Sequence, residues 1–371
     1  MKPFALWACL TLALCLSPIT SAAVNQETSK KFRIIYVEGG PFSNFQRIFQ
    51  GLCVKLQHLK LVQNGDVPIP RHTASLEPMW QWMVEHARGQ HIEFLADGFY
   101  SANYDEKKLY EMFNAIQQRI AEQNDVDAIL VFGTWAGKYV SKLDLSVPVI
   151  VSSVTDPILS GIVPSEDDSG KDNLVAVVNK DRYARHVELF ANIFGFHTLG
   201  IAYEDTETGR NSIALPQIEK AASHMGIKIV RCTDMFDIGN EDLAAESLTA
   251  CHRDLVRKGA DAVYVTYNMG ISEKSMPAIL APLLDAKIPT FSQRGGDEVD
   301  QGVLLGLAQS NDLAEGAYSA QLLSRIMAGE PARRLPQLYI EPINLQFNQE
   351  TAKRIGWKPT LEVLMAVDDI Y

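Results

Sequence analysis

The feature that most constrains the fold of this chain is a regular alternation of short apolar runs with amphipathic stretches of helical spacing. The apolar runs cover residues 32–37, 91–96, 128–132, 147–152, 174–178, 198–203, 227–232, 262–266, 288–292 and 303–308. Alternation of this kind predicts βαβ units and parallel sheets. The pattern of residues 31–156 returns over 174–268 without repeated sequence, so we expect two similar α/β lobes.

The length and the net charge of the chain narrow the class of protein further. The 371 residues are enough for two domains, at roughly 100–200 residues for each domain. With 47% hydrophobic and 21% charged residues, the chain has the composition of a globular protein. The formal net charge of -11 repels nucleic acid and anionic lipid, and no basic run offsets it. We therefore expect neither nucleic acid nor a lipid surface as a partner.

Residues 1–23 have the layout of a secretory signal peptide. One Lys precedes an apolar run from Phe4 to Leu16, and small residues end the segment at Ala23. The run is shorter than the roughly 20 residues that span a membrane. A lipoprotein-type reading of the sequence before Cys15 is disfavoured by the bulky Leu14. The segment predicts a secreted, periplasmic protein without a lipid anchor.

Removal of residues 1–23 leaves Cys53, Cys232 and Cys251 in an oxidising compartment. An odd number of cysteines leaves at least one thiol free. Cys232 ends a predicted strand and Cys251 lies on the following helix, so a bridge between them is within reach. The alternative, which the sequence favours, is that all three are buried and unpaired.

Polar residues follow the predicted strands of the first half. Since ligands of parallel α/β sheets bind beyond the carboxyl ends of the strands, these loops are candidate binding segments. The alternatives are helix capping for the hydroxyl and amide side chains and core packing for the aromatic ones. The candidates are Phe42, Ser43 and Asn44 after the Gly39-Gly40 turn, Gly133, Thr134 and Trp135 after the third strand, and Ser153, Thr155 and Asp156 after the fourth.

The second half adds a matching set of candidates. Tyr203, Asn211 and Ser212 follow one strand, and Tyr267 and Asn268 follow another. Simple capping explains Asn211 and Ser212 equally well. Arg294 is the well-placed cation of these loops. It either binds a carboxylate through two hydrogen bonds or takes part in a surface salt bridge.

Catalytic signatures are absent from the sequence. It contains no HExxH, GxSxG, P-loop or CxxC motif, and its histidines lack ligand-like spacing on a helix. We therefore expect no metal, no cofactor and no enzymatic activity.

One continuous run carries a family resemblance. The run Val147-Pro-Val-Ile-Val-Ser-Ser-Val-Thr-Asp-Pro157, continued by Ser160-Gly-Ile-Val163, resembles the ABC-transporter substrate-binding proteins of the tryptophan/tyrosine type. The likeness extends to Gly133-Thr134, to Gly200–Tyr203 with Asn211-Ser212, and to Ala328-Gly-Glu-Pro331. It covers most of residues 31–356.

The resemblance implies a type I periplasmic-binding fold, with two Rossmann-like lobes, parallel sheets and three crossings between the lobes. We place the crossings near 153–156, 266–268 and 308–310. The N-terminal lobe is then 31–153 plus 268–308, and the C-terminal lobe is 154–267 plus 309–346. Residues 347–371 are expected to form a C-terminal tail, and the protein is expected to be a monomer.

The resemblance also implies that a small molecule is held in the cleft between the lobes by hinge closure, for delivery to a membrane permease. By position, the family's ligand contacts correspond to Gly133-Thr134, Thr155-Asp156 and Asn211-Ser212. The family's frequent Pro-Thr-Asp-Asn is Val265-Thr-Tyr-Asn268 here, and Arg294 follows a changed turn. An acid suited to an ammonium group is thus lost, which favours a carboxylate-bearing or aromatic, amino-acid-like ligand. A periplasmic sensor that signals to a receptor kinase is the alternative.

The segment 59–90 is longer than an ordinary connection between a helix and a strand. It is a candidate rim of the cleft or a candidate partner surface.

Overall fold

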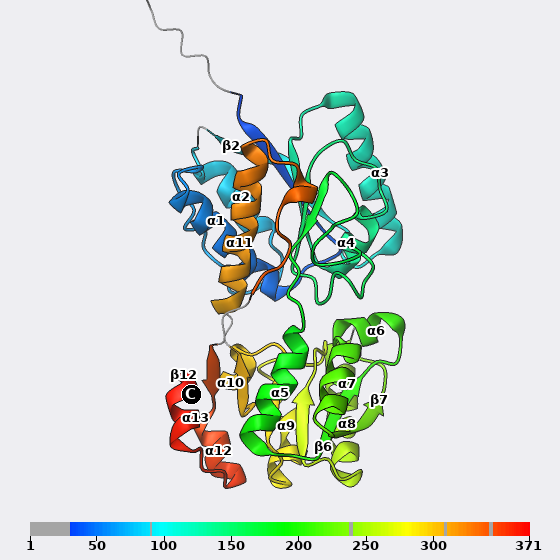
Figure 1. Cartoon of the computed structure of the whole chain (residues 1–371), viewed down its shortest axis with the longest axis vertical. Helices are drawn as coiled ribbons and strands as arrows, with labels where there is room; N and C mark the ends of the chain where they lie inside the picture. The colour runs from blue at the N-terminus through cyan, green and yellow to red at the C-terminus, as the bar shows by residue number, and fades with distance from the viewer. Residues whose placement is uncertain (1–29, 90, 237–239, 308–309, 341–343) are drawn as a thin grey trace, which may run out of the picture. The chain divides into compact units, whose positions relative to one another are not determined.

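The structure is a computed structural model that describes residues 30–371 apart from 90, 237–239, 308–309 and 341–343 (Figure 1). The expected signal peptide, residues 1–23, lies outside the described residues. Each apolar run predicted from the sequence overlaps one strand, β1 to β10 in chain order, and β2 extends five residues beyond its run, to Ser101. Two further strands, β11 and β12, lie near the C-terminal end.

The first sheet is parallel and has the strand order β2-β1-β3-β4-β5. Its strands are β1 (Phe32–Glu38), β2 (Ile92–Ser101), β3 (Ala128–Phe132), β4 (Val149–Ser152) and β5 (Leu174–Ala176). The helices between them are α1 (Ser43–His58), α2 (Glu77–His86), α3 (Glu106–Gln123) and α4 (Thr134–Val140). The order is that of a doubly wound sheet whose first and third strands are neighbours.

The second sheet repeats this order and extends it, as β12-β11-β10-β9-β8-β6-β7. Its strands are β6 (Thr198–Tyr203), β7 (Lys228–Thr233), β8 (Ala262–Val265), β9 (Thr290–Ser292), β10 (Leu305–Leu307), β11 (Leu345–Phe347) and β12 (Val367–Ile370). Only the β10–β11 pair is antiparallel among the described pairings. The helices are α5 (Arg182–Phe194), α6 (Glu207–Ser212), α7 (Leu215–His224), α8 (Glu241–Arg257), α9 (Met276–Asp285), α10 (Asp297–Asp300), α12 (Gln349–Ile355) and α13 (Leu361–Ala366).

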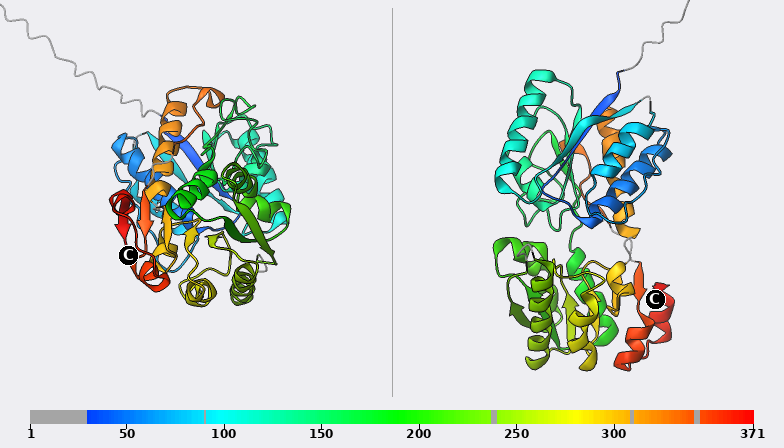
Figure 2. Two further views of the ribbon diagram at one scale, coloured as in Figure 1. Left: turned by 60° about the horizontal axis from the view of Figure 1, so that its bottom comes forward. Right: turned by 180° about the vertical axis from the view of Figure 1, so that it is seen from behind.

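Helices cover both faces of the first sheet, which explains why its strands are continuous apolar runs. Along β1, Ile34 and Tyr36 point into a core shared with α1 and α2, whereas Ile35 and Val37 point into a core shared with α3. This alternation is the two-residue period of a strand. Seen from behind, α3 and the pair α1 and α2 lie on opposite sides of the sheet (Figure 2).

Helix α11 (Ser310–Met327) follows β10 of the second sheet but packs in the first lobe, beside α1 (Figure 1). Leu322, Leu323 and Ile326 belong to the same core as Phe49 and Leu52 of α1. The two helices approach closely at two glycines. A Cβ atom on Gly316 would lie 1.8 Å from the Ile48 carbonyl oxygen, and one on Gly51 would lie 2.1 Å from that of Leu313.

The expected lobe boundaries are therefore wrong in three places. Residues 268–308 belong to the second lobe, because β9 is hydrogen-bonded to β8 and β10 to β9. In residues 309–346, α11 and the 3-10 helix Ala332–Arg334 pack in the first lobe, whose core includes Ala332 and Leu335. Residues 347–371 are no separate tail, because β11 and β12 extend the second sheet.

Two of the expected crossings are also wrong. The loop 153–156 connects β4 to its neighbour β5, and the loop 266–268 connects β8 to its neighbour β9. The chain instead leaves the first sheet after β5, where Val178 forms a parallel bridge with Leu338. The third expected crossing, 308–310, falls mainly outside the described residues. The strand before it, β10, belongs to the second sheet, whereas the helix after it, α11, packs in the first lobe.

The extra segment packs against the first sheet through α2, which contacts β2. Trp80 of α2 is buried and donates its indole N–H to the Leu95 carbonyl at 2.9 Å, and Gln81 donates to the Ala96 carbonyl at 3.2 Å. Both carbonyls lie where the register of β2 on β1 shifts. The segment thus satisfies backbone groups that the irregular edge strand leaves without ladder partners.

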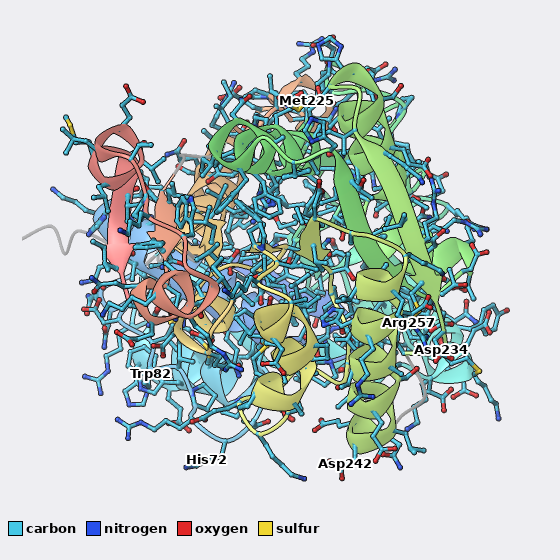
Figure 3. The ribbon with its side chains drawn as sticks, turned by 90° about the horizontal axis from the view of Figure 1, so that it is seen from below. His72, Trp82, Met225, Asp234, Asp242 and Arg257 are labelled. Carbon is cyan, nitrogen blue, oxygen red and sulfur yellow. A yellow bond between two sulfur atoms is a disulfide. The ribbon has the colours of Figure 1, made fainter. Side chains whose placement is uncertain are left out.

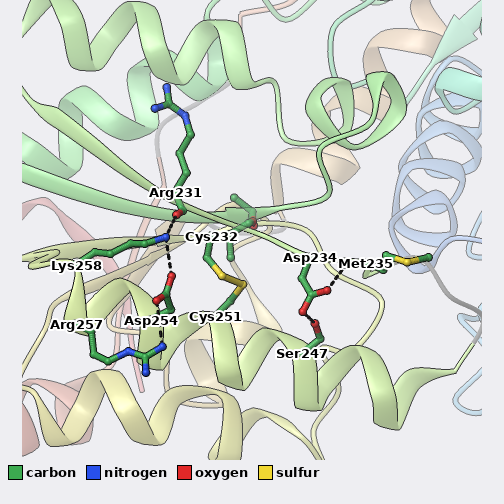
Figure 4. Close-up of a disulfide and its surroundings, with 11 residues drawn as sticks. Arg231, Cys232, Asp234, Met235, Ser247, Cys251, Asp254, Arg257 and Lys258 are labelled. Atoms are coloured by element: carbon green, nitrogen blue, oxygen red, sulfur yellow. Dashed lines mark hydrogen bonds and ion pairs between the residues drawn. A yellow bond between two sulfur atoms is a disulfide. The ribbon is translucent and has the colours of Figure 1, made fainter.

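A disulfide joins Cys232 of β7 to Cys251 of α8, with a Cα–Cα distance of 5.4 Å (Figure 4). The favoured prediction of three unpaired cysteines is therefore wrong for this pair, whereas Cys53 is a buried free thiol.

The ends of α8 carry charges that suit the helix dipole. On its exposed surface, the acidic Asp242 lies in the first turn and the basic Arg257 lies in the last turn (Figure 3).

Candidate functional site

Both lobes have the topological switch point at which doubly wound sheets bind ligands. In the first lobe it lies between β1 and β3, and in the second between β6 and β8. The loops that leave these four strands contain most of the residues predicted to bind a ligand. The second lobe has a pocket at its switch point, lined by Glu204, Thr206, Thr208, Gly209, Ser212, Ile213, Phe236, Tyr267, Asn268 and Met269.

Local hydrogen bonds shape one wall of this pocket. The Thr206 side chain caps α6 by accepting from the Gly209 N–H at 2.9 Å. A Cβ atom on Gly209 would lie 2.2 Å from the Glu204 carbonyl oxygen, so only glycine lets the helix start so close to β6. The Ser212 hydroxyl donates to the Thr208 carbonyl at 2.9 Å. This bond lies within the last turn of α6, so Ser212 does not act as a helix N-cap, and α7 has no side-chain cap at its N-cap residue Ala214.

Asn268 lines the pocket and contains an unused donor. The residue is 3% exposed, and its Oδ1 atom accepts from the Gly270 N–H at 2.7 Å. Its Nδ2 group has no hydrogen-bond partner among the described residues. Because an unsatisfied buried donor costs about 1–3 kcal/mol, it is a natural place for a ligand acceptor or an ordered water.

Gln293, which is not among the residues predicted to bind a ligand, connects three of the loops. Its Oε1 atom accepts from the Tyr267 N–H at 2.7 Å, and its Nε2 group donates to the Ser212 carbonyl at 3.0 Å. The residue is 5% exposed. It therefore fixes the position of Tyr267 relative to α6 on one side of the pocket.

Arg294 lies next in the same loop and contacts the first lobe. Its Nη2 group donates to the Ser43 hydroxyl at 2.9 Å, and its guanidinium carbon lies 5.6 Å from the centre of the Phe42 ring. The Phe42 ring also packs edge-on against Tyr267, at 5.4 Å between ring centres. The predicted residues Phe42, Ser43, Tyr267 and Arg294 therefore form one contact group.

The Gly39-Gly40 turn is filled by side chains of this chain. A Cβ atom on Gly39 would lie 2.8 Å from the Trp135 ring, and one on Gly40 would lie 2.5 Å from the Tyr104 ring. The two rings stack at 6.2 Å. Trp135 thus packs on the turn, as its core-packing alternative held.

Two capping expectations for the first lobe are wrong. Neither Ser43 nor Asn44 caps α1, whose N-cap residue Phe42 makes no side-chain cap bond. Thr134 does not cap α4, which begins after Gly133 with φ +89° and without a side-chain cap. Asn44, Gly133 and Thr134 are half-buried at this end of the first sheet.

The loop after β4 is held by hydrogen bonds to other protein groups. The Oδ1 atom of Asp156 accepts from the N–H groups of Ile158 and Leu159, and its Oδ2 atom accepts from Gln217 Nε2 at 2.6 Å. The Ser153 N–H donates to Glu315 at 2.7 Å. Thr155, which lies between Ser153 and Asp156 in the sequence, is half-buried. Both Asp156 oxygens thus have protein donors, which a ligand would have to share.

Two further predicted residues lie near the pocket without lining it. Tyr203 is 5% exposed, and burial raises the pKa of its hydroxyl. Asn211 is half-buried, and its backbone carbonyl accepts from the Ala214 N–H at 3.1 Å. The structure therefore brings Ser212, Tyr267 and Asn268 into one pocket and leaves Tyr203 and Asn211 behind it.

Within the described ranges, no three His, Cys, Asp or Glu side chains converge as metal ligands would. In the same part of the chain, no helix combines the length and apolar character needed to cross a membrane.

Comparison with known proteins gives a family and a fold. The family model described as ABC transporter substrate binding protein matches residues 90–369. A conserved domain protein from Vibrio cholerae is 17% identical with a TM-score of 0.67, over 92% of this chain and 100% of that one. A Streptococcus pneumoniae ABC domain in complex with L-Trp is 16% identical with a TM-score of 0.65, again over 92% and 100%.

A ligand-free substrate-binding protein with adhesive properties from Clostridium difficile is also similar. It is 18% identical with a TM-score of 0.59, over 91% of this chain and 98% of that one. No curated protein matches the chain. These neighbours have the type I periplasmic-binding fold, which is also the fold of this chain.

Proposed function

Because this chain belongs to the family of ABC transporter substrate-binding proteins, we propose that it captures an amino-acid-like solute for an uptake transporter. The solute would be carboxylate-bearing or aromatic and would bind where the switch points of the two lobes face each other. Binding would close the lobes about their connecting segments, since a ligand that contacts both lobes favours the closed state.

The observation that carries the proposal is the buried, unpartnered Nδ2 group of Asn268 in the pocket at the second switch point. A donor in this position suits a carbonyl or carboxylate oxygen of a ligand. The neighbouring Tyr267 ring supplies an apolar wall, and Glu204 places a carboxylate in the same lining. Oriented polar groups beside aromatic surface are typical of small-molecule sites.

Arg294 and Phe42 support the ligand class. The Nε group of Arg294 is buried and has no hydrogen-bond partner among the described residues, so the guanidinium retains a donor for a carboxylate. The ring of Phe42 lies between this cation and Tyr267. An aromatic acid or amino acid matches such surroundings, and the streptococcal neighbour is a complex with L-Trp.

The proposal includes a location and a partner. The signal-peptide pattern of residues 1–23 supports a periplasmic location, where the ligand-bound form would dock on a membrane permease. Catalysis is not part of this function. ATP hydrolysis by the reconstituted transporter should rise when the ligand-bound protein is added, whereas a response of a receptor kinase alone would favour the sensor alternative.

Binding itself is tested on protein purified without denaturation. Native mass spectrometry identifies a co-purified ligand, and a thermal-shift screen with amino acids and aromatic acids follows. A hit should be weakened at least tenfold in Arg294→Ala and in Asn268→Ala, because each loses a direct contact. Arg253→Ala, which removes an exposed cation on α8, is the matched control. Binding that is unchanged in both site variants contradicts the proposed site.

A further inference from the structure

A buried acid lies beside Arg294 and has no role in the proposed site so far. Glu298 is in α10 and is 4% exposed. Its Oε2 atom accepts from the Ser292 hydroxyl, and its Oε1 atom lies 3.7 Å from Arg294 Nη1. Oε1 has no hydrogen-bond partner among the described residues. A buried carboxylate that is only half satisfied is unusual enough to require an explanation.

The three nitrogen atoms of the Arg294 side chain have different surroundings. Nη2 donates to Ser43, Nη1 faces Glu298, and the buried Nε has no described partner. The side chain is 20% exposed. The same pair of residues therefore contains an unused donor and an unused acceptor, next to the Phe42 ring.

The turn that holds this pair is fixed by its backbone. Ser292 Oγ accepts from the Arg294 N–H at 3.1 Å and from the Gly295 N–H at 2.7 Å. Gly295 has φ +67°, and a Cβ atom on it would lie 1.7 Å from the Leu307 carbonyl oxygen. The Gly296 N–H donates to Gln346 at 2.8 Å. Glu298 and Arg294 therefore cannot separate by a simple change of the turn.

The pair is balanced in charge before any ligand binds. A ligand carboxylate at Arg294 would place a second negative charge against one guanidinium in a largely buried site, which is costly. Burial raises the pKa of Glu298, and Arg294 opposes this shift. Asp297 raises the pKa as well, and it is itself paired with Arg47 of α1 at 3.5 Å. On the neighbouring strand β12, burial raises the pKa of Tyr371, and Asp369, Asp300 and Asp297 raise it further.

We propose that Glu298 determines the charge selectivity of the site, by taking up a proton when Arg294 accepts the carboxylate of a ligand. This inference rests on the proposed function. It predicts that the affinity for a monoanion falls as pH rises, because more free energy is then needed to protonate Glu298. The affinity for a neutral ligand of the same shape has no such dependence.

The pair is tested first without ligand. The titration of Glu298 is followed by NMR of 13C-labelled carboxyl groups, and its signal is assigned by comparison with Glu298→Gln. Removal of the cation in Arg294→Met should raise the titration midpoint by at least about one pH unit, whereas Arg294→Lys should raise it less. Asp297→Asn is the opposite control: it removes an exposed negative charge that raises the pKa of Glu298, so it should lower the midpoint. A midpoint that is the same in wild type and Arg294→Met overturns the inference.

Calorimetry with benzoate and its neutral isostere benzamide then tests selectivity. In two buffers of different ionisation enthalpy, wild type should take up a fraction of a proton per benzoate bound and none per benzamide. Glu298→Gln should bind benzoate about tenfold more tightly at neutral pH and without proton uptake, since one pH unit corresponds to a factor of ten. Equal benzoate affinity in wild type and Glu298→Gln overturns the inference. The titration midpoint of Glu298 could rise in Arg294→Met while the protein binds neither benzoate, benzamide nor any amino acid. This result would support the electrostatic coupling of Glu298 to Arg294 and contradict the proposed function.

Discussion

Gly270 donates its backbone N–H to Asn268 Oδ1 at 2.7 Å, and this bond leaves the Nδ2 group as the end of the amide without a described partner. Asn268→Asp should keep the bond to Gly270 but replace the free donor by a charged acceptor. Affinity for a carboxylate ligand should fall by at least about tenfold, because a charge-assisted donor contact is lost and a repulsion is added. Calorimetry with the ligand found in the screen measures this.

Asn268→Ser is the companion variant, since a hydroxyl can both accept from Gly270 and donate. It should lose less affinity than Asn268→Asp. If both variants bind as wild type does, Asn268 does not contact the ligand.

The disulfide between Cys232 and Cys251 should stabilise the second lobe. The two residues are 19 positions apart, and closing a loop of this length contributes about 3 kcal/mol. Reductant should therefore lower the urea midpoint of wild type but leave that of the double variant Cys232→Ala/Cys251→Ala unchanged. Cys53→Ala, at the buried free thiol, is the control that should still respond to reductant.

The α1–α11 contact should be sensitive to one methyl group. In Gly316→Ala the added Cβ would meet the Ile48 carbonyl at 1.8 Å, so the helices must move apart. We expect a loss of about 1–3 kcal/mol in the free energy of unfolding, as for other overpacked interiors. Gln321→Ala, at an exposed position of the same helix, should have no such cost. Equal stabilities of the two variants would show that α11 does not pack on α1 as described.

Two buried histidines should make stability depend on pH. His252 is 1% exposed, and burial lowers its pKa to about 4, while its Nδ1 atom lies 2.8 Å from the Ile279 carbonyl. Burial also lowers the pKa of His186. Between pH 6.5 and about 4 the unfolded chain binds a proton that the folded protein does not. The free energy of unfolding should therefore fall as pH falls through this window, by roughly 3 kcal/mol for His252.

His252→Asn should remove most of this residue's contribution to the slope. The amide can donate to Ile279 in place of the ring N–H but does not titrate. His197→Asn, the same substitution at an exposed histidine, is the control variant. Urea unfolding at several pH values compares the three proteins, and a slope unchanged in His252→Asn would refute the assignment.

The strands were predictable because each is marked by its own apolar run. The partner of a strand is not marked in this way, since pairing depends on residues far along the chain. The polar residues from Ser153 to Asp156 suggest a crossing in the sequence, but in the structure Asp156 forms a turn by accepting from the N–H groups of Ile158 and Leu159. Strands β11 and β12 are short and lie beside exposed residues, so their apolar signal is weak.

The loops that line the pocket were predictable from the sequence. Ser212, Tyr267 and Asn268 line it, and polar residues after a buried strand are visible in the sequence. Gln293 and Glu298 were missed, because their importance lies in burial and in the groups they contact. Glu298 belongs to the acidic stretch Asp297–Asp300, which in sequence is typical of a solvated surface.

The position of α11 also has a consequence for how the chain acquires its fold. During synthesis the apolar face of α1 has no helix to cover it until every strand from β6 to β10 has been made. Residues 31–178 alone would therefore expose that face and tend to aggregate. A soluble first lobe should be obtained only by joining this segment to residues 310–340, so that the two distant pieces are supplied together.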